Sequence, residues 1–243
     1  MDKKGRIFQT LQGILERYRS LEGGVDYFAL IADTSIVEYA DSLAEFNPDV
    51  LNSENERLAF WINCYNALSI AGVVKKLKKN PEYAEEGNSS WIQRVKFFAL
   101  QKFNVGGKKY TLREIENHIR ENFQEPRIHF ALNCSSKGCP ALKNGLYSSE
   151  NLDSELDEAT RLYLQSSKGL QLDKEKCILF LSMIFKWYKD DFEHDEVKIV
   201  DFILRYIDDE KREFITNHRE DIDIKYIDYD WSLNLSTDSE GAK

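Results

Sequence analysis

The residues best suited to chemistry gather in the stretch Arg127 to Leu142, RIHFALNCSSKGCPAL. It brings a histidine, an amide and two cysteines next to a loop that contains glycine. Cys134 directly follows an apolar run, and the loop after it would offer several backbone N–H groups and the side chain of Lys137. A thiol that faces N–H groups and a lysine ionises readily and can act as a nucleophile. The stretch therefore predicts a site in which Cys134 is the nucleophile.

A cysteine nucleophile needs a base, and His129 is the nearest candidate in the sequence. Asp191 could orient His129 as the third member of a triad. On a straight strand, however, His129 and Cys134 point to opposite faces, so the two meet only if the chain bends at Asn133. Small and apolar neighbours also suit a buried, inert cysteine. Both interpretations of Cys134 remain open at this point.

Cys134 and Cys139 could also bond to each other across the small loop. Their spacing is not the CxxC of dithiol oxidoreductases, which favours a structural bridge over a redox catalyst. A zinc ion would need both cysteines, His129 and a distant ligand such as His118 or His194. Structural zinc usually takes paired ligands from two separate loops, and this chain offers only one pair with the wrong gap. We therefore predict no metal and no cofactor.

Two amides lie in an otherwise apolar segment. Asn63 and Asn66 are three residues apart and so share one face of a helix. Buried amides must find hydrogen-bond partners, so they either tie neighbouring backbone together or line a pocket. The structural clamp is favoured, and the pocket gains support if Asn133 faces the two amides.

Other polar residues are candidates for supporting a site. Thr111 and Glu114 form a capping box, whereas Glu116 has no local role. Arg127 is expected to pair with Glu116 or Asp191. A dense cluster of polar and aromatic residues contains Lys186, Trp187, Tyr188, Asp190 and Asp191. Within it, we predict that Lys186 and Tyr188 support the site.

Composition excludes several classes of partner. The chain has 243 residues and a formal net charge of -9, which argues against nucleic acid and anionic membranes because both require a basic face. No apolar run approaches the roughly 18 residues of a membrane span. The N-terminus lacks the apolar region of an export signal, and four cysteines make no disulfide framework. We expect a cytoplasmic protein that binds a small molecule or a peptide of unknown identity, in an oligomeric state the sequence does not give.

Helices and hairpins must position these residues. The longest helix is expected over Glu54 to Lys79, which is apolar nearly all round before it becomes basic. The run Ile128 to Asn133 is predicted to be a buried strand. Two hairpins are expected, one joining 97–105 to 108–110 about a Gly-Gly pair and one joining 170–172 to 177–181. Further helices are predicted over 1–20, 111–120, 151–165, 182–192, 197–207 and 210–217, with loop over 80–90 and an edge strand over 222–231.

Six segments occur in an order and spacing that resemble the family named domain of unknown function 547. They are VDYFALIADTSIVEYADSL, AFWINCYNALSI, YTLREIE, RIHFALNCSSKGCPAL, FKWYKDDF and YDWSLN, and they extend from about Gly24 to Leu235. The family label promises no activity. The resemblance implies a context of stand-alone or exported proteins, or of fusion to coiled-coil or glutaredoxin-like modules, and hence either a redox link or a scaffold role. Many relatives have a histidine directly after the glutamate of the IE motif, whereas this chain has Asn117 and then His118.

The predicted architecture is a single α+β domain over 24–235, in which a small, mostly antiparallel sheet packs against several helices. An amphipathic helix over 1–23 precedes it and a disordered tail over 236–243 follows it. The predicted function is a cysteine-dependent hydrolase or acyl transferase built on Cys134, His129 and Asp191, with loop N–H groups as the oxyanion hole. The alternative is a non-catalytic module that binds a protein or peptide and has a structural Cys134–Cys139 loop. A thiol-redox or zinc-linked domain is the third possibility.

Overall fold

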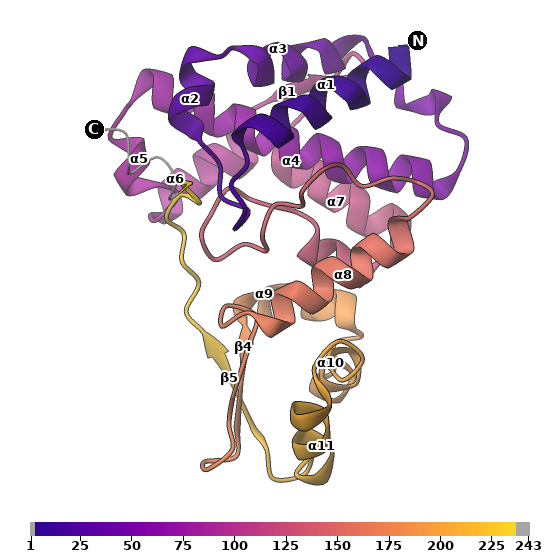
Figure 1. The fold of residues 1–243 in the computed structure, drawn as a ribbon, viewed down its shortest axis with the longest axis vertical. Helices are drawn as coiled ribbons and strands as arrows, with labels where there is room; N and C mark the ends of the chain where they lie inside the picture. The colour runs from indigo at the N-terminus through magenta and orange to yellow at the C-terminus, as the bar shows by residue number, and fades with distance from the viewer. Residues whose placement is uncertain (1–2, 237–243) are drawn as a thin grey trace. The chain divides into compact units, whose positions relative to one another are not determined.

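The structure is a computed structural model that describes residues 3–236 (Figure 1). It is an α+β fold in which helices accompany two small sheets, so the predicted class is confirmed. The chain forms two compact units. Among the described residues, the first contains 3–123, 132–152 and 230–236, and the second contains 124–131 and 153–229. The boundary at residue 24 stays a prediction.

Helix α4 (Glu54–Lys79) is the centre of the first unit, with the predicted bounds. Ser53 and Glu56 form a capping box at its start, and lysines occupy its last turn, where they oppose the negative end of the helix dipole. Helices α2, α3 and α7 pack against it (Figure 1). Every residue from Leu58 to Val74 is buried. An apolar sequence on all sides of a helix requires this central position.

The remaining elements of the first unit are short helices and one hairpin. The hairpin pairs β1 (Phe103–Val105) with β2 (Lys108–Tyr110) in antiparallel register about Gly106 and Gly107, both with positive φ. The other helical elements are α1 (Lys3–Tyr18), α2 (Tyr27–Ala32), α3 (Ser35–Ser42), η1 (Leu43–Glu45), η2 (Pro48–Val50), α5 (Tyr83–Glu86), α6 (Trp91–Arg94), η3 (Val95–Leu100) and α7 (Leu112–Phe123). The expected hairpin is confirmed, but its first strand is shorter than predicted because 95–100 form a π-helix.

The second unit is built on a three-stranded sheet of order β3-β4-β5. Strands β3 (Leu170–Asp173) and β4 (Ile178–Ser182) form the second predicted hairpin. The predicted edge strand is β5 (Asp223–Ile227), which pairs with β4 in parallel (Figure 1). The helices of this unit are η4 (Pro126–Phe130), α8 (Leu152–Gln165), α9 (Met183–Trp187), η5 (Lys189–Phe192), α10 (Glu196–Ile203) and α11 (Asp209–Asn217). Phe130, Phe185 and Phe202 lie in its apolar core.

The predicted strand from Ile128 to Asn133 is wrong. Its first residues belong to the 3-10 helix η4, in which Ile128, His129 and Phe130 are all buried. Pro126 occupies the first turn, where its fixed φ suits a helix, and the Glu125 side chain accepts a hydrogen bond from the N–H of Arg127. A short apolar run satisfies either a strand or a buried helical turn, and here the local cap decides.

Two smaller expectations also need correction. The segment predicted as loop over 80–90 contains the short helix α5. The predicted tail begins too early, because Ser236 is buried and its N–H donates to the carbonyl of Val25. The rest of that tail, 237–243, lies outside the described residues.

Candidate functional site

The first unit holds the cysteine loop, which we define as Asn133 to Pro140. Cys134 and Cys139 form a disulfide, with their Cα atoms 6.2 Å apart. Cys139 is buried and Cys134 is half-buried. The N–H of Cys134 also donates to Sγ of Cys139 at 2.9 Å. In this state neither sulfur is a thiolate, so Cys134 has no nucleophile to offer.

Asn133 joins the cysteine loop to helix α4. Its N–H donates to Oδ1 of Asn66 at 2.7 Å, and its Nδ2 donates to the carbonyl of Pro140 at 2.7 Å. Its Oδ1 accepts from the N–H of Ser135 at 2.9 Å and from Nδ2 of Asn234 at 3.3 Å. The structure therefore brings Asn66 and Asn133 together, as the pocket interpretation required. These hydrogen bonds join the two amides to backbone groups and to the side chain of Asn234, as expected of a structural clamp.

Asn63 clamps a different segment. Its Nδ2 donates to the carbonyl of Tyr147 at 2.8 Å, and its Oδ1 accepts from the N–H of the same residue at 3.0 Å. The side-chain amide thus both donates to and accepts from the backbone of one residue, as a neighbouring β-strand would, and it does so in a buried site. Asn63 thus fixes the chain that follows the cysteine loop rather than facing an open cavity.

The loop N–H groups expected to form an oxyanion hole already have acceptors. Lys137 and Gly138 donate to the carbonyls of Ser232 and Asp230, both at 2.8 Å. Ser135 donates to Asn133 and Cys139 donates to the carbonyl of Ser136. An oxyanion hole needs donors that point at the reacting atom, and donors already bonded within the protein do not stabilise an external charge.

The second unit holds the histidine pair, His129 and Asp191. Nε2 of His129 lies 2.6 Å from Oδ2 of Asp191, and the imidazole is buried. Its ring stacks on Tyr188, with centroids 4.0 Å apart. His129 comes from η4 and Asp191 from η5, so two separate helical turns create the contact. The sequence prediction that Asp191 orients His129 matches this geometry, and the role of the pair in catalysis stays a prediction.

Arg127 has other partners than those expected. Its guanidinium forms ion pairs with Glu125 and Asp157, both at 2.6 Å, and with Asp153 at 2.8 Å. These bonds, above all those that Arg127 donates to Glu125, raise the pKa of Arg127 beyond its ordinary value despite partial burial. Burial would raise the pKa of Asp157, but the hydrogen bonds from Arg127 and Tyr206 lower it overall. Arg127 therefore joins η4 to helix α8 rather than to Glu116 or Asp191.

The remaining predicted residues are dispersed. Glu116 is half-buried on α7. The pKa of Tyr65 is raised mainly because its hydroxyl is buried, and the negative charge of Glu116 raises it further. Lys186 is exposed, with its Nζ 5.3 Å from the centre of the Tyr226 ring. Cys134, Cys139, Asn133, Asn63, Asn66 and Glu116 belong to the first unit, and His129, Asp191, Tyr188, Arg127 and Lys186 belong to the second.

Sequence reasoning missed the C-terminal segment as a support of the cysteine loop. Asn234 bonds to Asn133 and accepts from the hydroxyl of Tyr27 at 2.7 Å. The hydroxyls of Ser69 and Ser135 also share a buried hydrogen bond of 2.7 Å. The YDWSLN segment, which contains Asn234, was a usable signal, because a cluster of polar residues after a strand needs a partner.

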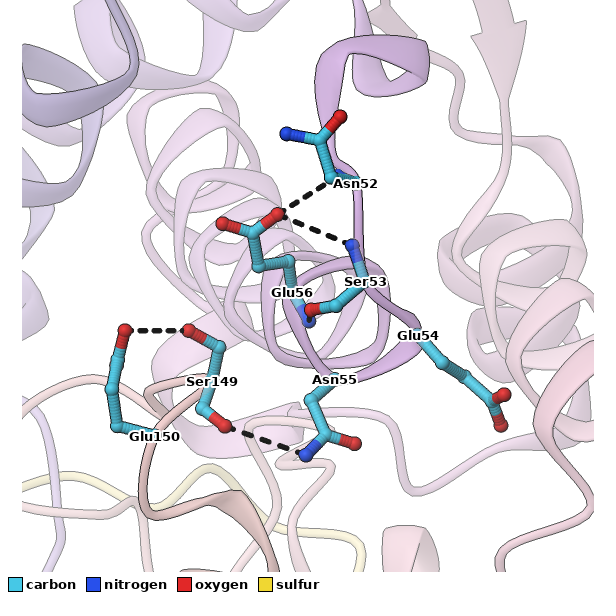
Figure 2. A pocket seen from close by; sticks show the side chains of 7 residues that line it. All are labelled: Asn52, Ser53, Glu54, Asn55, Glu56, Ser149 and Glu150. Carbon is cyan, nitrogen blue, oxygen red and sulfur yellow. Dashed lines mark hydrogen bonds between the residues drawn. The ribbon is translucent and has the colours of Figure 1, made fainter.

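A pocket of about 620 Å³ lies at the start of α4 (Figure 2). Two of its three carboxylates bond to the segments beside them: Glu56 accepts from the N–H of Asn52 at 2.8 Å, and Glu150 accepts from the hydroxyl of Ser149 at 2.9 Å. Asn55 donates to the carbonyl of Ser149. The lining residues thus cap a helix and fasten a loop, which is a complete structural role.

Residues 48–164 match the model of a family described as "Protein of unknown function, DUF547". This segment contains α4, the hairpin, α7, the cysteine loop and most of α8. The segment is a domain of that family, which confirms the resemblance there. No curated protein and no solved structure matches the chain.

Two further findings bear on the other interpretations. Within residues 3–236, no group of three or more histidine, cysteine and acidic residues is placed to hold a metal ion. Over the same residues, no helix combines the length and the apolar character that crossing a membrane demands.

Proposed function

We propose that the protein is a non-catalytic binding module that recognises an apolar segment of a protein or peptide. The observation that carries this proposal is a row of exposed large side chains on α6 and η3. Trp91, Ile92 and Leu100 have exposed fractions of 70%, 58% and 63%. We call these three residues and Lys96 the apolar face. Tryptophan and aliphatic residues exposed together are typical of surfaces that bind partners.

The π-helix explains why these residues share one face. In an α-helix each residue turns by about 100°, which would put Leu100 on a different side from Ile92. The wider i→i+5 turn rotates each residue by less, and Gln101 accordingly donates to the carbonyl of Lys96. This smaller rotation brings Leu100 closer to the side of Ile92, whereas Phe97 is buried. Inserted π turns are frequent at functional sites.

Lys96 gives the apolar face a chemical preference. It is exposed between Ile92 and Leu100 in the sequence and makes no ion pair within the described part of the chain. A partner that places aromatic or aliphatic residues on Trp91 and Leu100 gains most by placing a carboxylate on Lys96. The expected partner is therefore an apolar segment with an acidic residue.

The cysteine loop supports a binding role over catalysis by this loop. Its two sulfurs are bonded to each other, and six of its N–H groups have acceptors within the protein. A loop held in this way has a fixed shape and no activated group. Such a loop is what a rigid scaffold for a binding surface requires.

Selection from a random-peptide library against the purified protein tests the proposal. We expect recovered peptides to contain aromatic or aliphatic residues with an acidic neighbour, and to bind at least about tenfold more weakly to the variant Trp91→Ser/Leu100→Ser. Phe28→Ser is the matched control, because Phe28 is an exposed aromatic residue on another helix, α2. Peptides that bind all three proteins equally, or a selection that recovers none, would overturn the proposal.

The histidine pair favours a second candidate, the cysteine-dependent hydrolase or acyl transferase. A buried imidazole with a carboxylate 2.6 Å away is the arrangement that orients a general base. This function applies only to the reduced protein, since Cys134 must first be released from Cys139. Iodoacetamide labelling of Cys134 before and after reduction tests it, with Cys64 and Cys177 as internal controls. Labelling of the reduced protein that is unchanged in His129→Ala would rule this candidate out.

A further inference from the structure

A second pocket of the first unit has a different character from the apolar face. It encloses about 400 Å³, a volume within the range of small-molecule sites. We call it the lysine pocket. Its lining comes from α3, η1, the end of α4 and the hairpin, and consists of Ala40, Asp41, Ala44, Lys75, Lys102, Phe103, Asn104 and Lys109.

The lining of the lysine pocket is positively charged, although the chain as a whole is negatively charged. The chain carries a net charge of -9, yet the lining has Lys75, Lys102 and Lys109 against a single carboxylate, that of Asp41. Asp41 is occupied by Lys75, with 3.0 Å between Oδ1 and Nζ. Across the described residues, Lys102 and Lys109 form no ion pair. The ammonium group of Lys109 is therefore available to a ligand, and so is that of Lys102, whose charge also acts on the carboxylate of Glu114.

The hairpin register places these two lysines on one side of the sheet. Lys109 is the direct cross-strand partner of Asn104, and Lys102 lies two residues before Asn104. Residues opposite each other, and residues two apart on one strand, share a face. All three are exposed, whereas Phe103 between them is buried. The strand geometry thus places two lysines and an amide on the same face of the hairpin.

The opposite wall leaves room for a ligand. Ala40 and Ala44 are four residues apart in the sequence, and neither side chain extends beyond Cβ. Phe103, which is buried, also contributes to the lining. A ligand that fits must present negative charge to the hairpin and a small apolar part to this wall.

We infer that the lysine pocket binds a small organic dianion, of the phosphate monoester or dicarboxylate class, through Lys102 and Lys109. Lysine is a flexible point charge with three donors, which suits a phosphate or a carboxylate at either lysine. Lys75 offsets the charge of Asp41, so that Lys102 and Lys109 set the net charge of the lining, and Asn104 can donate a further hydrogen bond. This inference does not depend on the proposed apolar face.

Isothermal titration calorimetry with phenyl phosphate, succinate and inorganic phosphate tests the inference and separates the two sources of charge. We expect saturable binding of phenyl phosphate or succinate that weakens with salt. Lys102→Gln/Lys109→Gln should raise the dissociation constant at least about tenfold, because two charge-assisted hydrogen bonds are lost. Lys78→Gln/Lys79→Gln removes the same charge at exposed positions on the end of α4 and should change it by less than about twofold.

A second variant distinguishes a pocket from a general attraction to positive charge. Ala44→Leu keeps all three lysines and fills space beside Ala40, so it should also abolish binding. Circular dichroism of each variant checks that it is folded. The inference is overturned if no probe binds saturably, if benzyl alcohol binds as well as phenyl phosphate, or if the Lys78/Lys79 variant loses as much affinity as the Lys102/Lys109 variant.

Discussion

The two parts of the stretch 127–142 belong to different compact units. Its first part, up to Ala131, belongs to the second unit, where His129 meets Asp191. Its second part, from Leu132 on, belongs to the first unit, where the cysteine loop is bonded to α4 and to the C-terminal segment. Chemical groups that are adjacent in a sequence need not act together, because packing assigns each one to its own set of neighbours. Hydrogen bonds to distant parts of the sequence hold the cysteine loop, whereas a contact of 2.6 Å and a stacked Tyr188 hold His129.

The largest effect should come from removing the amide of Asn133. Asn133→Ala leaves the N–H of Ser135 and the carbonyl of Pro140 without their partner in a buried site. Each such loss costs about 1–3 kcal/mol, so the free energy of unfolding should fall by about 3–5 kcal/mol. Urea unfolding measures it. Asn117→Ala, at an exposed position on α7, is the control and should cost less than about 0.5 kcal/mol.

Opening the disulfide should have a smaller effect than losing Asn133. The bridge closes a loop with a sequence separation of 5, for which the chain-entropy model gives about 2 kcal/mol. Cys134→Ala/Cys139→Ala should therefore lower the free energy of unfolding by about 2 kcal/mol and leave the loop in place, since the amide clamps remain. Urea unfolding with and without dithiothreitol checks this. A variant that unfolds outright would show that the bridge, not the amides, holds the loop.

Breaking the histidine pair should lower the free energy of unfolding by less than opening the disulfide does. Asp191→Ala removes the acceptor at 2.6 Å from the buried imidazole of His129 and should cost about 1–2 kcal/mol. Asp190 provides a matched control, because its ion pair with His194 is exposed on both sides and Asp190→Ala should cost less than about 0.5 kcal/mol. If both substitutions lower the free energy of unfolding equally, the buried contact between His129 and Asp191 stabilises the second unit no more than an exposed ion pair does.

The sequence predicted helices better than the path of the chain through the site. The bounds of α4 followed from a capping box at Ser53 and a lysine-rich last turn, both local signals. The hairpin at Gly106 followed from two glycines that alone accept its positive φ values without strain. The run at Ile128 carried no such signal, since its apolar residues suit a strand or a helical turn equally. The acceptors of the loop N–H groups lie about ninety residues away, at Asp230 and Ser232, and no local pattern reports such a contact.

The smallest predicted effect concerns a histidine of the first unit, His118, which packs edge-on against Trp61. Burial lowers the pKa of His118 below its ordinary value of 6.5, and the charge of Glu121 opposes this only partly. The unfolded chain therefore binds a proton at a higher pH than the folded protein does, so stability falls as the pH drops through 6.5 and stops falling below the folded pKa. His118→Gln should remove less than about 1 kcal/mol of this acid-side loss, because the ring is partly exposed and screened by solvent. Urea unfolding of both proteins from about pH 8 to about pH 5 measures the difference, and parallel curves would contradict the burial of this ring as the cause.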